Sequence, residues 1–570
     1  MTAKDIIIGI DLGTTNSLIS VFTESGPELI PNALGSFMTP SAVGYGDDGS
    51  LLIGQAAKDR LVTHPNLTTA RFKRYMGTDH ETRLGKKTYR AEELSALILK
   101  SLKSDAETHL GHSVSRAIIS VPAYFNDVQR RATKTAAEMA GLKVERLINE
   151  PTAAALAYGL QDREAETTFL VVDLGGGTFD VSILEMFSGV MEVRASSGDA
   201  FLGGEDFTDT LMEYLAQTAE IETKDLSPED TSRLRATTDK IKHKLTESFE
   251  AGANFSLKGK EYRLSITRDK FAEICEPLTK RIRLPIQRAI SDAGLKAEDI
   301  DRILLVGGAT RMDCIRGLIT RLFRRFPEHE IDPDHVVALG AGVQSGLASR
   351  HAALDDLVMT DVAPFTLGYE VSREVGPDAF EAGHFSPLIE RNTIVPVSRS
   401  HLTYPVKLGQ TIILLRIFQG EAPFVKDNVQ IGSLNVPIPK NTKDLEAVEV
   451  RFTYDASGIL EVIARIVSNG NEVRLVIEGN PGSLTPQEIE QRLQALDGLK
   501  IHPREQQENT AFMARLSTLF ESLLGHDRQQ VGHFIHDFET AMHTQDAKTI
   551  AECRQRIEPM LERLEDKNVF

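Results

Sequence analysis

Cysteine, tryptophan and long apolar runs are scarce or absent in this sequence. The three cysteines, Cys275, Cys314 and Cys553, lie far apart and form no CxxC pair, which is typical of reduced thiols rather than a disulfide framework or a zinc site. No apolar stretch approaches the ~18 residues that a membrane-spanning helix needs. The N-terminal MTAKDIII also lacks the apolar core of a signal peptide. We therefore expect a cytoplasmic protein without membrane contact.

The sequence also has fewer basic than acidic residues. It contains 64 lysines and arginines and 82 aspartates and glutamates, which gives a net charge of -18. Phosphate backbones are held by clustered lysine and arginine, so this balance disfavours nucleic acid as a partner. Neither GxxxxGK[ST] nor HExxH occurs, which excludes a Walker-type nucleotide site and a zincin-type metal site. A chain of 570 residues is too long for one core and predicts roughly two to four structural units.

The chain changes character along its length. Residues 5–350 alternate β-rich runs such as DIIIGID, TFLVVDLG and RILLVGG with helical stretches such as RRATKTAAEMAGL, which predicts an α/β architecture. Period-2 runs broken by Gly, Asn and Pro turns then predict an all-β unit. After Thr485, an expected N-cap, the pattern is helical. We therefore predict domains at 1–353, 365–483 and 484–570, with a linker at 354–364.

Two loops follow apolar runs in the same manner: DLGTTNS begins at Asp11, and DLGGGTFD begins at Asp173. Their glycines let backbone N–H groups approach a phosphate, and the threonine and asparagine side chains add hydrogen bonds. The two carboxylates would repel a phosphate without a cation between them, which implies Mg²⁺ held through water. One such loop alone is more often a strand-ending turn. Two matched copies, with a third glycine pair in LLVGGATRM, favour a duplicated domain whose halves clasp one nucleotide.

Seven longer motifs occur in a fixed order: IGIDLGTTNS, VPAYFNDVQRRAT, INEPTAAALAYGL, DLGGGTFDVSI, LGGEDF, LVGGATRM and DPDHVVALGAGVQSG. In them the chain resembles the DnaK-type seventy-kilodalton heat-shock chaperone family, and TLGYE, IERNTIVPV, FQGE and YDASGILEV extend the match. The departures from the family pattern, described below, are more similar to the HscC-like bacterial branch. The resemblance implies a duplicated, two-lobed, actin-like α/β ATPase domain, an all-β sandwich that binds apolar peptide and an α-helical lid. It also implies an ATP-dependent chaperone in which hydrolysis controls peptide affinity allosterically.

The resemblance implies roles for residues around ATP and Mg²⁺. Asp11 and Asp173 are expected to orient the water shell of Mg²⁺, and Thr178 to lie near the γ-phosphate. Lys73 is expected to neutralise charge on the γ-phosphoryl group, and Glu150 to orient water or metal. The expected nucleotide-binding residues are Gly13, Thr14, Thr15, Asn16, Gly175, Gly176, Gly177, Gly203, Gly204, Asp239, Lys242, Thr246, Gly307, Gly308, Arg311 and Asp334. Without the resemblance, Lys73 would be interpreted as a surface lysine and Glu150 as a helix-start acid.

Three of the nucleotide-binding candidates, Asp239, Lys242 and Thr246, are spaced by three and four residues, so we expect them on one helical face. The family usually has Glu and Ser where this chain has Asp239 and Thr246. Arg311 is a residue type that can stack its planar guanidinium on a base.

The resemblance further implies two groups of residues outside the nucleotide site. Val406 and Ile413 match positions that line a peptide pocket. Pro122, Arg130, Arg146, Asn149 and Asp361 match positions for allosteric coupling and for contact with a J-domain co-chaperone. Thr360 replaces an aliphatic linker residue, which predicts weaker linker docking. A shortened segment around residues 246–270 predicts fast nucleotide release, so the need for a nucleotide exchange factor is doubtful.

Two other classes remain open on the same fold, a metabolic phosphotransferase and an actin-like filament protein. Neither accounts for residues 365–570.

Overall fold

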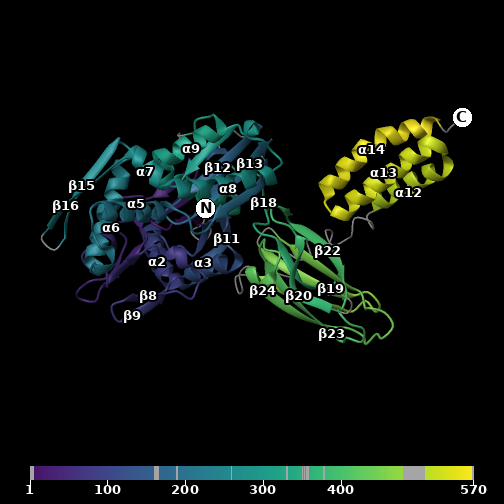
Figure 1. The fold of residues 1–570 in the computed structure, drawn as a ribbon, viewed down its shortest axis with the longest axis horizontal. Coiled ribbons are helices and arrows are strands. Elements are labelled where there is room, and N and C mark those ends of the chain that lie inside the picture. Colours follow the sequence, from purple (N-terminus) through teal and green to yellow (C-terminus); the bar gives the residue numbers. More distant parts are fainter. Residues whose placement is uncertain are drawn as a thin grey trace.

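The computed structural model describes residues 6–159, 166–187, 190–257, 260–328, 331–349, 351, 354, 358–376, 379–455, 458–478 and 507–567. Figure 1 shows three parts along the chain: a large α/β part, a part built of strands and a bundle of helices. Of the helices within these residues, none is both long and apolar enough to cross a membrane.

The first lobe, residues 6–149, is built on a mixed sheet with the strand order β11-β10-β1-β2-β3. In β1, Ile8 and Ile10 lie in one core and Ile7 in another, as the period of two dictates for a strand buried on both faces. Its elements are β1 (Ile7–Leu12), β2 (Asn16–Thr23), β3 (Gly26–Ile30), β4 (Thr39–Pro40), β5 (Ala42–Tyr45), β6 (Leu51–Ile53), α1 (Gln55–Arg60), β7 (Thr68–Ala70), the 3-10 helix η1 (Phe72–Tyr75), β8 (Glu81–Leu84), β9 (Lys87–Arg90), α2 (Ala91–Leu110), β10 (Arg116–Val121), α3 (Asp127–Met139) and β11 (Lys143–Asn149).

The second lobe, residues 166–328, is built on a sheet with the order β17-β12-β13-β14, and two later strands, β18 (Val358–Val362) and β21 (Ile394–Val395), extend it beyond β14. Its β12–β13 hairpin with parallel β17 repeats the arrangement of β1, β2 and β10. Its elements are β12 (Thr167–Leu174), β13 (Phe179–Phe187), β14 (Val190–Asp199), α5 (Gly204–Thr218), η2 (Thr223–Asp225), α6 (Pro228–Lys244), β15 (Glu250–Leu257), β16 (Lys260–Thr267), α7 (Arg268–Ile274), α8 (Glu276–Asp292), η3 (Ala297–Asp299), β17 (Arg302–Val306), η4 (Gly308–Arg311) and α9 (Asp313–Phe323). The predicted mixture of helices and strands is thereby confirmed.

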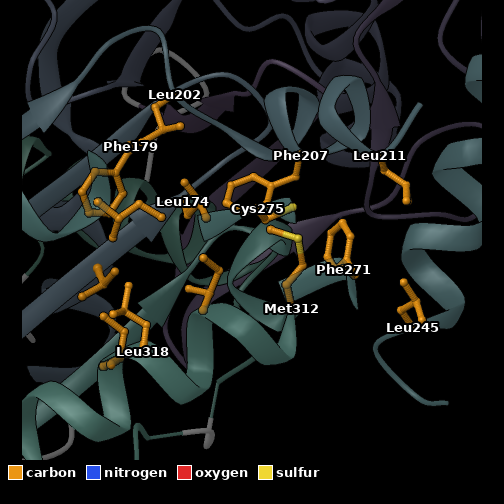
Figure 2. Close-up of a cluster of buried hydrophobic side chains, with 14 of the residues drawn as sticks. Leu174, Phe179, Leu202, Phe207, Leu211, Leu245, Phe271, Cys275, Met312 and Leu318 are labelled. Atoms are coloured by element: carbon orange, nitrogen blue, oxygen red, sulfur yellow. The ribbon is translucent and has the colours of Figure 1, made fainter. Parts of the chain in front are cut away.

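Two helices, α4 (Glu150–Gly159) and α10 (Val336–Ala348), pack against each other and against strands of both sheets. A Cβ added to Gly340 would stand 1.7 Å from the carbonyl oxygen of Ala153, so only glycine permits this close helix approach. The core of the second lobe lies on the other face of its sheet. Figure 2 shows part of it, where Phe179 and Leu174 of the hairpin gather with Phe207 of α5 and with Cys275.

The third part is a pair of facing sheets with the orders β20-β19-β23-β24 and β22-β25-β26-β27. Leu415 and Ile417 from the first sheet share a core with Val450 and Phe452 from the second, which makes the part a β-sandwich. Its elements are β19 (Leu367–Gly376), β20 (Ala379–Ile389), β21 (Ile394–Val395), β22 (Val397–Thr403), β23 (Ile412–Gln419), η6 (Val425–Asp427), β24 (Val429–Pro437), β25 (Val448–Tyr454), β26 (Ile459–Ile466) and β27 (Glu472–Glu478).

The predicted linker contains a strand, β18 (Val358–Val362), which pairs with β14 of the second lobe and with β21 beside the sandwich. The sandwich also contacts both lobes directly. The backbone N–H of Asp127 in the first lobe donates to Gln419 Oε1 over 3.1 Å, and that of Ser196 in the second lobe donates to Asn392 Oδ1 over 2.9 Å. The domain limits given above stay a prediction.

The last part contains α12 (Gln507–Ser522), α13 (Gly525–Thr544) and α14 (Ala547–Lys567), and the predicted N-cap Thr485 lies outside the described residues. Leu516, Phe538 and Ile557 form its core. Gln545, which follows α13, meets the sandwich at Ser400 of β22. Its Oε1 accepts the Ser400 N–H over 3.1 Å, and its Nε2 donates to the Ser400 carbonyl over 2.8 Å.

Candidate functional site

A cleft of about 380 Å³ lies between the two lobes, and the two aspartate-glycine loops meet in it. Each loop follows the first strand of its lobe's hairpin, β1 or β12, so the repeated topology brings the two strand ends face to face. The predicted residues that line the cleft are Asp11, Gly13, Thr14, Thr15, Asn16, Lys73, Glu150, Asp173, Gly175, Gly176, Thr178, Gly204, Asp239, Lys242, Thr246, Gly307, Gly308, Arg311 and Asp334.

The loops approach each other so closely that side chains are excluded. A Cβ added to Gly176 would stand 2.2 Å from the Thr15 hydroxyl oxygen. Gly177 and Gly203, the two predicted nucleotide-binding residues that do not line the cleft, pack behind the second loop, since a Cβ on Gly203 would stand 2.4 Å from the backbone nitrogen of Gly177. The missing side chains let the loop backbone come close to a bound anion, although the Gly203 N–H already donates to Asp206 Oδ2 over 2.8 Å.

The carboxyl groups of Asp11, which is half-buried, and of Asp173, which is buried, form the centre of the cleft. Burial, reinforced by the negative charge of Glu150, raises the pKa of Asp11 to about 7, although the Ser120 hydroxyl donates to Asp11 Oδ1 over 2.7 Å. Burial, followed by the charges of Glu150 and Asp180, raises the pKa of Asp173 well above its ordinary value. Repulsion between the negative charges and the loss of hydration both raise the pKa values of these carboxyl groups. A bound cation would relieve both effects.

Asp180 belongs to this acidic centre but was not among the predicted site residues. It lies directly opposite Asp173 in the β12–β13 register and accepts the Tyr124 N–H over 2.8 Å. Burial first, and then the charge of Glu150, raises its pKa to about 8. The sequence contains one signal for this role of Asp180, its place at the end of DLGGGTFD. A hairpin that turns within this motif pairs the two aspartates.

An ion pair joins the acidic centre to the first lobe. Lys73 Nζ, on η1, lies 2.8 Å from Oε1 of Glu150, the first residue of α4, and both side chains are less than a tenth exposed. Lys73 is therefore not the surface lysine that its sequence context alone indicates. A buried charge is costly unless it is paired, so each partner requires the other.

The acidic centre suits a hard cation that keeps part of its hydration shell. Its oxygen ligands are the type that Mg²⁺ takes. Over the described part of the chain, however, no group of three or more His, Cys, Asp or Glu side chains is arranged to hold a metal directly. A cation at Asp11 and Asp173 would complete its shell with water or phosphate oxygens, and the water-mediated Mg²⁺ binding expected above stays a prediction.

The far end of the cleft is formed by α6 and its following turn. Helix α6 ends at Lys244, so Thr246 is not on the helix as expected but in the turn, where its N–H donates to the His243 carbonyl over 3.1 Å. Lys242 Nζ lies 2.8 Å from Asp239 Oδ1. Burial alone would raise the pKa of Asp239, but hydrogen bonds and charge from His243 and Lys242 lower it below its ordinary value.

Arg311 lies at the rim of the cleft, and its orientation is fixed by two carboxylates. Its Nη2 lies 2.6 Å from Asp332 Oδ1 and 2.9 Å from Asp334 Oδ2. The guanidinium face is thus held in place at the wall. Met38 and His243 also line the cleft, and no sequence pattern marked either of them.

A second, smaller cavity of about 80 Å³ lies where β18 meets the first lobe, and Arg130, Arg146, Asn149 and Asp361 line it. Arg130 Nη2 donates to Asn149 Oδ1 over 2.7 Å, and Asn149 Nδ2 lies 3.4 Å from both Asp361 carboxylate oxygens. Burial raises the pKa of Asp361, and the charge of Arg146 opposes that rise.

The remaining predicted residues lie apart from both cavities. Pro122 is buried just after β10 and does not line the second cavity. Ile413 is half-buried against the core of the sandwich, and Val406 is half-buried in the connection between β22 and β23. Their role toward peptide stays a prediction.

Comparison with known proteins covers nearly the whole chain. Residues 7–84 and 80–568 match a family described as Hsp70 protein. The chaperone protein DnaK of Thermotoga petrophila is 38% identical over 577 residues, which cover 99% of this chain and 93% of that protein. The chaperone protein DnaK of Thermosipho melanesiensis is 42% identical over 490 residues, covering 84% and 80%. The finer assignment to the HscC-like branch stays a prediction.

Proposed function

Because the chain belongs to the Hsp70 family, we propose that the cleft between its lobes binds Mg²⁺-ATP and that the β-sandwich binds extended apolar peptide. As an Hsp70 chaperone, the protein is an ATPase that acts in protein folding. The observation that carries the residue-level proposal is the meeting of both aspartate-glycine loops with the buried Lys73–Glu150 pair in one cleft.

The chemistry follows from positioning and charge, because phosphoryl transfer to water needs little covalent help from the protein. Bound Mg²⁺ would supply positive charge to the phosphate oxygens, with Asp11 and Asp173 holding its water shell. The backbone N–H groups of the two loops bind the phosphates. Lys73 stabilises negative charge that develops on the γ-phosphoryl group, and Glu150 accepts a hydrogen bond from the attacking water and so orients it. Thr178, which lines the same cleft, is proposed to lie near the γ-phosphate.

The nucleoside is proposed to bind at the far end of the cleft. Asp239 and Lys242 face the ribose, with Thr246 from the turn after α6, and the fixed guanidinium of Arg311 stacks on the base. The support for this arrangement is that both walls are already held in place, by the Lys242–Asp239 pair and by the two carboxylates on Arg311.

Communication with the sandwich is proposed to run through β18. This strand pairs with β14 of the second lobe, and its Asp361 contacts Asn149 of the first lobe. A change in the angle between the lobes therefore alters the site on which the linker docks. By thermodynamic reciprocity, peptide binding also changes the nucleotide site. A J-domain co-chaperone is proposed to act at the second cavity, near Arg146 and Asn149. An exchange factor is not required in this proposal.

The metabolic phosphotransferase and the filament-forming ATPase are not favoured, because the family match runs through residue 568 and so includes the sandwich and the helices. We place the cycle in the cytoplasm, as the sequence predicts.

The test is the dissociation rate of a fluorescently labelled apolar peptide, measured with ADP and then with ATP and Mg²⁺. Release at least tenfold faster in ATP is expected from a coupling free energy of about 1.4 kcal/mol or more. The variant Asp11→Asn/Asp173→Asn should remove the difference, because its cleft holds the cation poorly. Equal rates in the unmodified protein would refute the proposed coupling.

A further inference from the structure

Several large apolar side chains of the β-sandwich are exposed, and six of them gather at one end of it. Each of the six leaves between 44% and 54% of its surface in contact with solvent. They lie on the connections β22–β23 and β24–β25 or within three residues of them: Leu402, Tyr404, Leu408, Ile412, Leu414 and Leu445. A single exposed apolar side chain is ordinary, whereas a group of them marks a surface that binds another molecule.

The strand pairing places these two connections at the same end of the sandwich. Thr403, at the end of β22, pairs with Val448, at the start of β25. Ile412, at the start of β23, pairs with Pro437, at the end of β24. Both connections therefore cross from one sheet to the other side by side.

Backbone hydrogen bonds join the two connections directly. The Gly409 N–H donates to the Asn441 carbonyl over 2.6 Å, and the Ile438 N–H donates to the Thr411 carbonyl over 2.9 Å. The apolar side chains thus belong to one surface. We call residues 402–414 and 438–447 the end surface. Val406 and Ile413, the predicted peptide contacts, are part of it.

The exposed charges of the two connections are mainly positive. On residues 404–411 and 438–447, which the structure describes completely, Lys407, Lys440 and Lys443 are exposed. Asp444 is the one exposed acidic residue there, because Glu446 is buried. None of the three ammonium groups forms an ion pair within the described part of the chain. The sign of this local charge is opposite to that of the whole chain, whose net charge is -18.

The lysines lie next to the apolar side chains. A Cβ added to Gly409 would stand 4.0 Å from Cε of Lys440, so the Lys440 stem reaches the other connection, where Lys407 and Leu408 lie. A lysine covers apolar surface with its stem and keeps its ammonium group in water. A peptide that buries apolar side chains at the end surface therefore meets positive charge beside them.

We propose that the end surface selects client segments in which acidic residues flank an apolar core, and that Lys407, Lys440 and Lys443 contact those acidic residues. The inference rests on the proposed function, because it presumes that the sandwich binds extended apolar peptide. Charge complementarity determines the choice of ligand, since unpaired ammonium groups attract carboxylates and repel lysine and arginine. Because the lysines are exposed, they contribute to selectivity more than to affinity.

The experiment uses the full chain with ADP and three fluorescently labelled peptides. All three share one core of four leucine or valine residues, which is flanked on each side by two glutamates, two glutamines or two lysines. Fluorescence anisotropy should give the lowest Kd for the glutamate-flanked peptide and the highest for the lysine-flanked peptide. The two values should differ by about five- to twentyfold, as expected of a few exposed ion pairs.

Reversing the charge of the lysines should reverse this order. The variant Lys407→Glu/Lys440→Glu/Lys443→Glu should bind the lysine-flanked peptide most tightly, whereas the Kd of the glutamine-flanked peptide should stay within about twofold. Substitutions at exposed positions of this kind change stability little. Lys426→Glu is the matched control, because Lys426 is an exposed lysine of the same sandwich that lies on η6, outside both connections.

A second measurement needs no substitution. Salt screens exposed charges, so the Kd values of the three peptides for the unmodified protein should converge as the ionic strength rises. The Kd of the glutamine-flanked peptide should change least. Differences between the peptides that persist at high salt would contradict selection by charge.

The remaining outcomes distinguish this inference from the function on which it rests. If all three peptides bind the unmodified protein with the same Kd, selection by charge is refuted and the proposed peptide binding stands. If none of them binds, the proposed peptide binding itself fails.

Two other occupants of the end surface would each give a different result. If the triple variant changes the Kd of all three peptides equally, the lysines hold the helical bundle rather than the client, which overturns the inference. If the order of the peptides is unchanged and the variant instead alters self-association in sedimentation, the end surface binds a second copy of the chain, which also overturns it.

Discussion

Thr360 of β18 lies opposite Glu192 of β14 in a parallel ladder, and its hydroxyl oxygen is buried without a hydrogen-bond partner among the described residues. A buried hydroxyl that makes no hydrogen bond costs about 1 to 3 kcal/mol. The cost applies only while the strand is docked, so it works against docking.

Replacing Thr360 with valine should strengthen linker docking, because valine has nearly the same shape and carries no hydroxyl. We expect amide hydrogen exchange in residues 358–362 to slow about tenfold in the Thr360→Val protein with ATP, equivalent to ~1.4 kcal/mol. Thr88→Val, at an exposed position of β9, is the control. Unchanged exchange in β18 would show that the hydroxyl is hydrated in solution.

The Lys73–Glu150 pair should be needed for both hydrolysis and stability. Lys73→Ala should slow single-turnover hydrolysis at least about 100-fold, because a charge aimed at the reacting phosphate is lost. It should also lower the free energy of unfolding by roughly 3 to 5 kcal/mol, because Glu150 is left buried and unpaired. Adding Glu150→Gln should recover much of that stability but none of the activity. Urea unfolding and rapid-quench assays measure the two effects, and simple additivity of the stability losses would contradict the pairing.

Asp180 should make the nucleotide-free protein less stable as pH rises. Its folded pKa of about 8 exceeds the ordinary 3.8, so between these values the folded state binds a proton that the unfolded state releases. The free energy of unfolding therefore falls as pH rises through this window. Asp180→Asn does not titrate, so its advantage over the unmodified protein should grow by more than ~1 kcal/mol between pH 5 and pH 8. Urea unfolding at both values tests this, with the exposed Asp444→Asn as control. Parallel curves would mean that Asp180 stays ionised.

Gly176→Ala should force the two phosphate loops apart, because its Cβ would stand 2.2 Å from the Thr15 hydroxyl oxygen. Overpacking of this kind costs about 1 to 3 kcal/mol, so the Kd for ATP should rise roughly tenfold or more. Gly376→Ala is the matched control, since its Cβ would meet nothing closer than 3.8 Å. Calorimetric titration gives both constants. An unaltered Kd would mean that Thr15 moves aside at no cost.

Short-range patterns are enough to pick out the two loops that meet in the cleft. The loops at Asp11 and Asp173 could be read from sequence because a strand end, a glycine turn and an aspartate are neighbours in the chain. The family resemblance added Lys73 and Glu150, which no local pattern marks, since their pairing depends on how η1 and α4 pack in three dimensions.

The features that the sequence did not predict depend on contacts between distant residues or on the residue at which a helix ends. The Arg71–Glu205 contact joins residues 134 positions apart, and its geometry exists only after both lobes have formed. Thr246 was expected on α6 because periodicity continues past Lys244, whereas the helix end is set by local turn bonding. Asp180 is a polar residue in a strand, and its burial follows from the sheet rather than from its neighbours in sequence.

The contact between Gln545 and Ser400 has a consequence for how the protein behaves among its own copies. β22 is the outer strand of its sheet, and outer strands present unpaired backbone groups that invite strands from other molecules. With one donor and one acceptor, the glutamine amide occupies the Ser400 backbone as a neighbouring strand would. The helical bundle thereby covers a point at which self-association into extended sheets could begin.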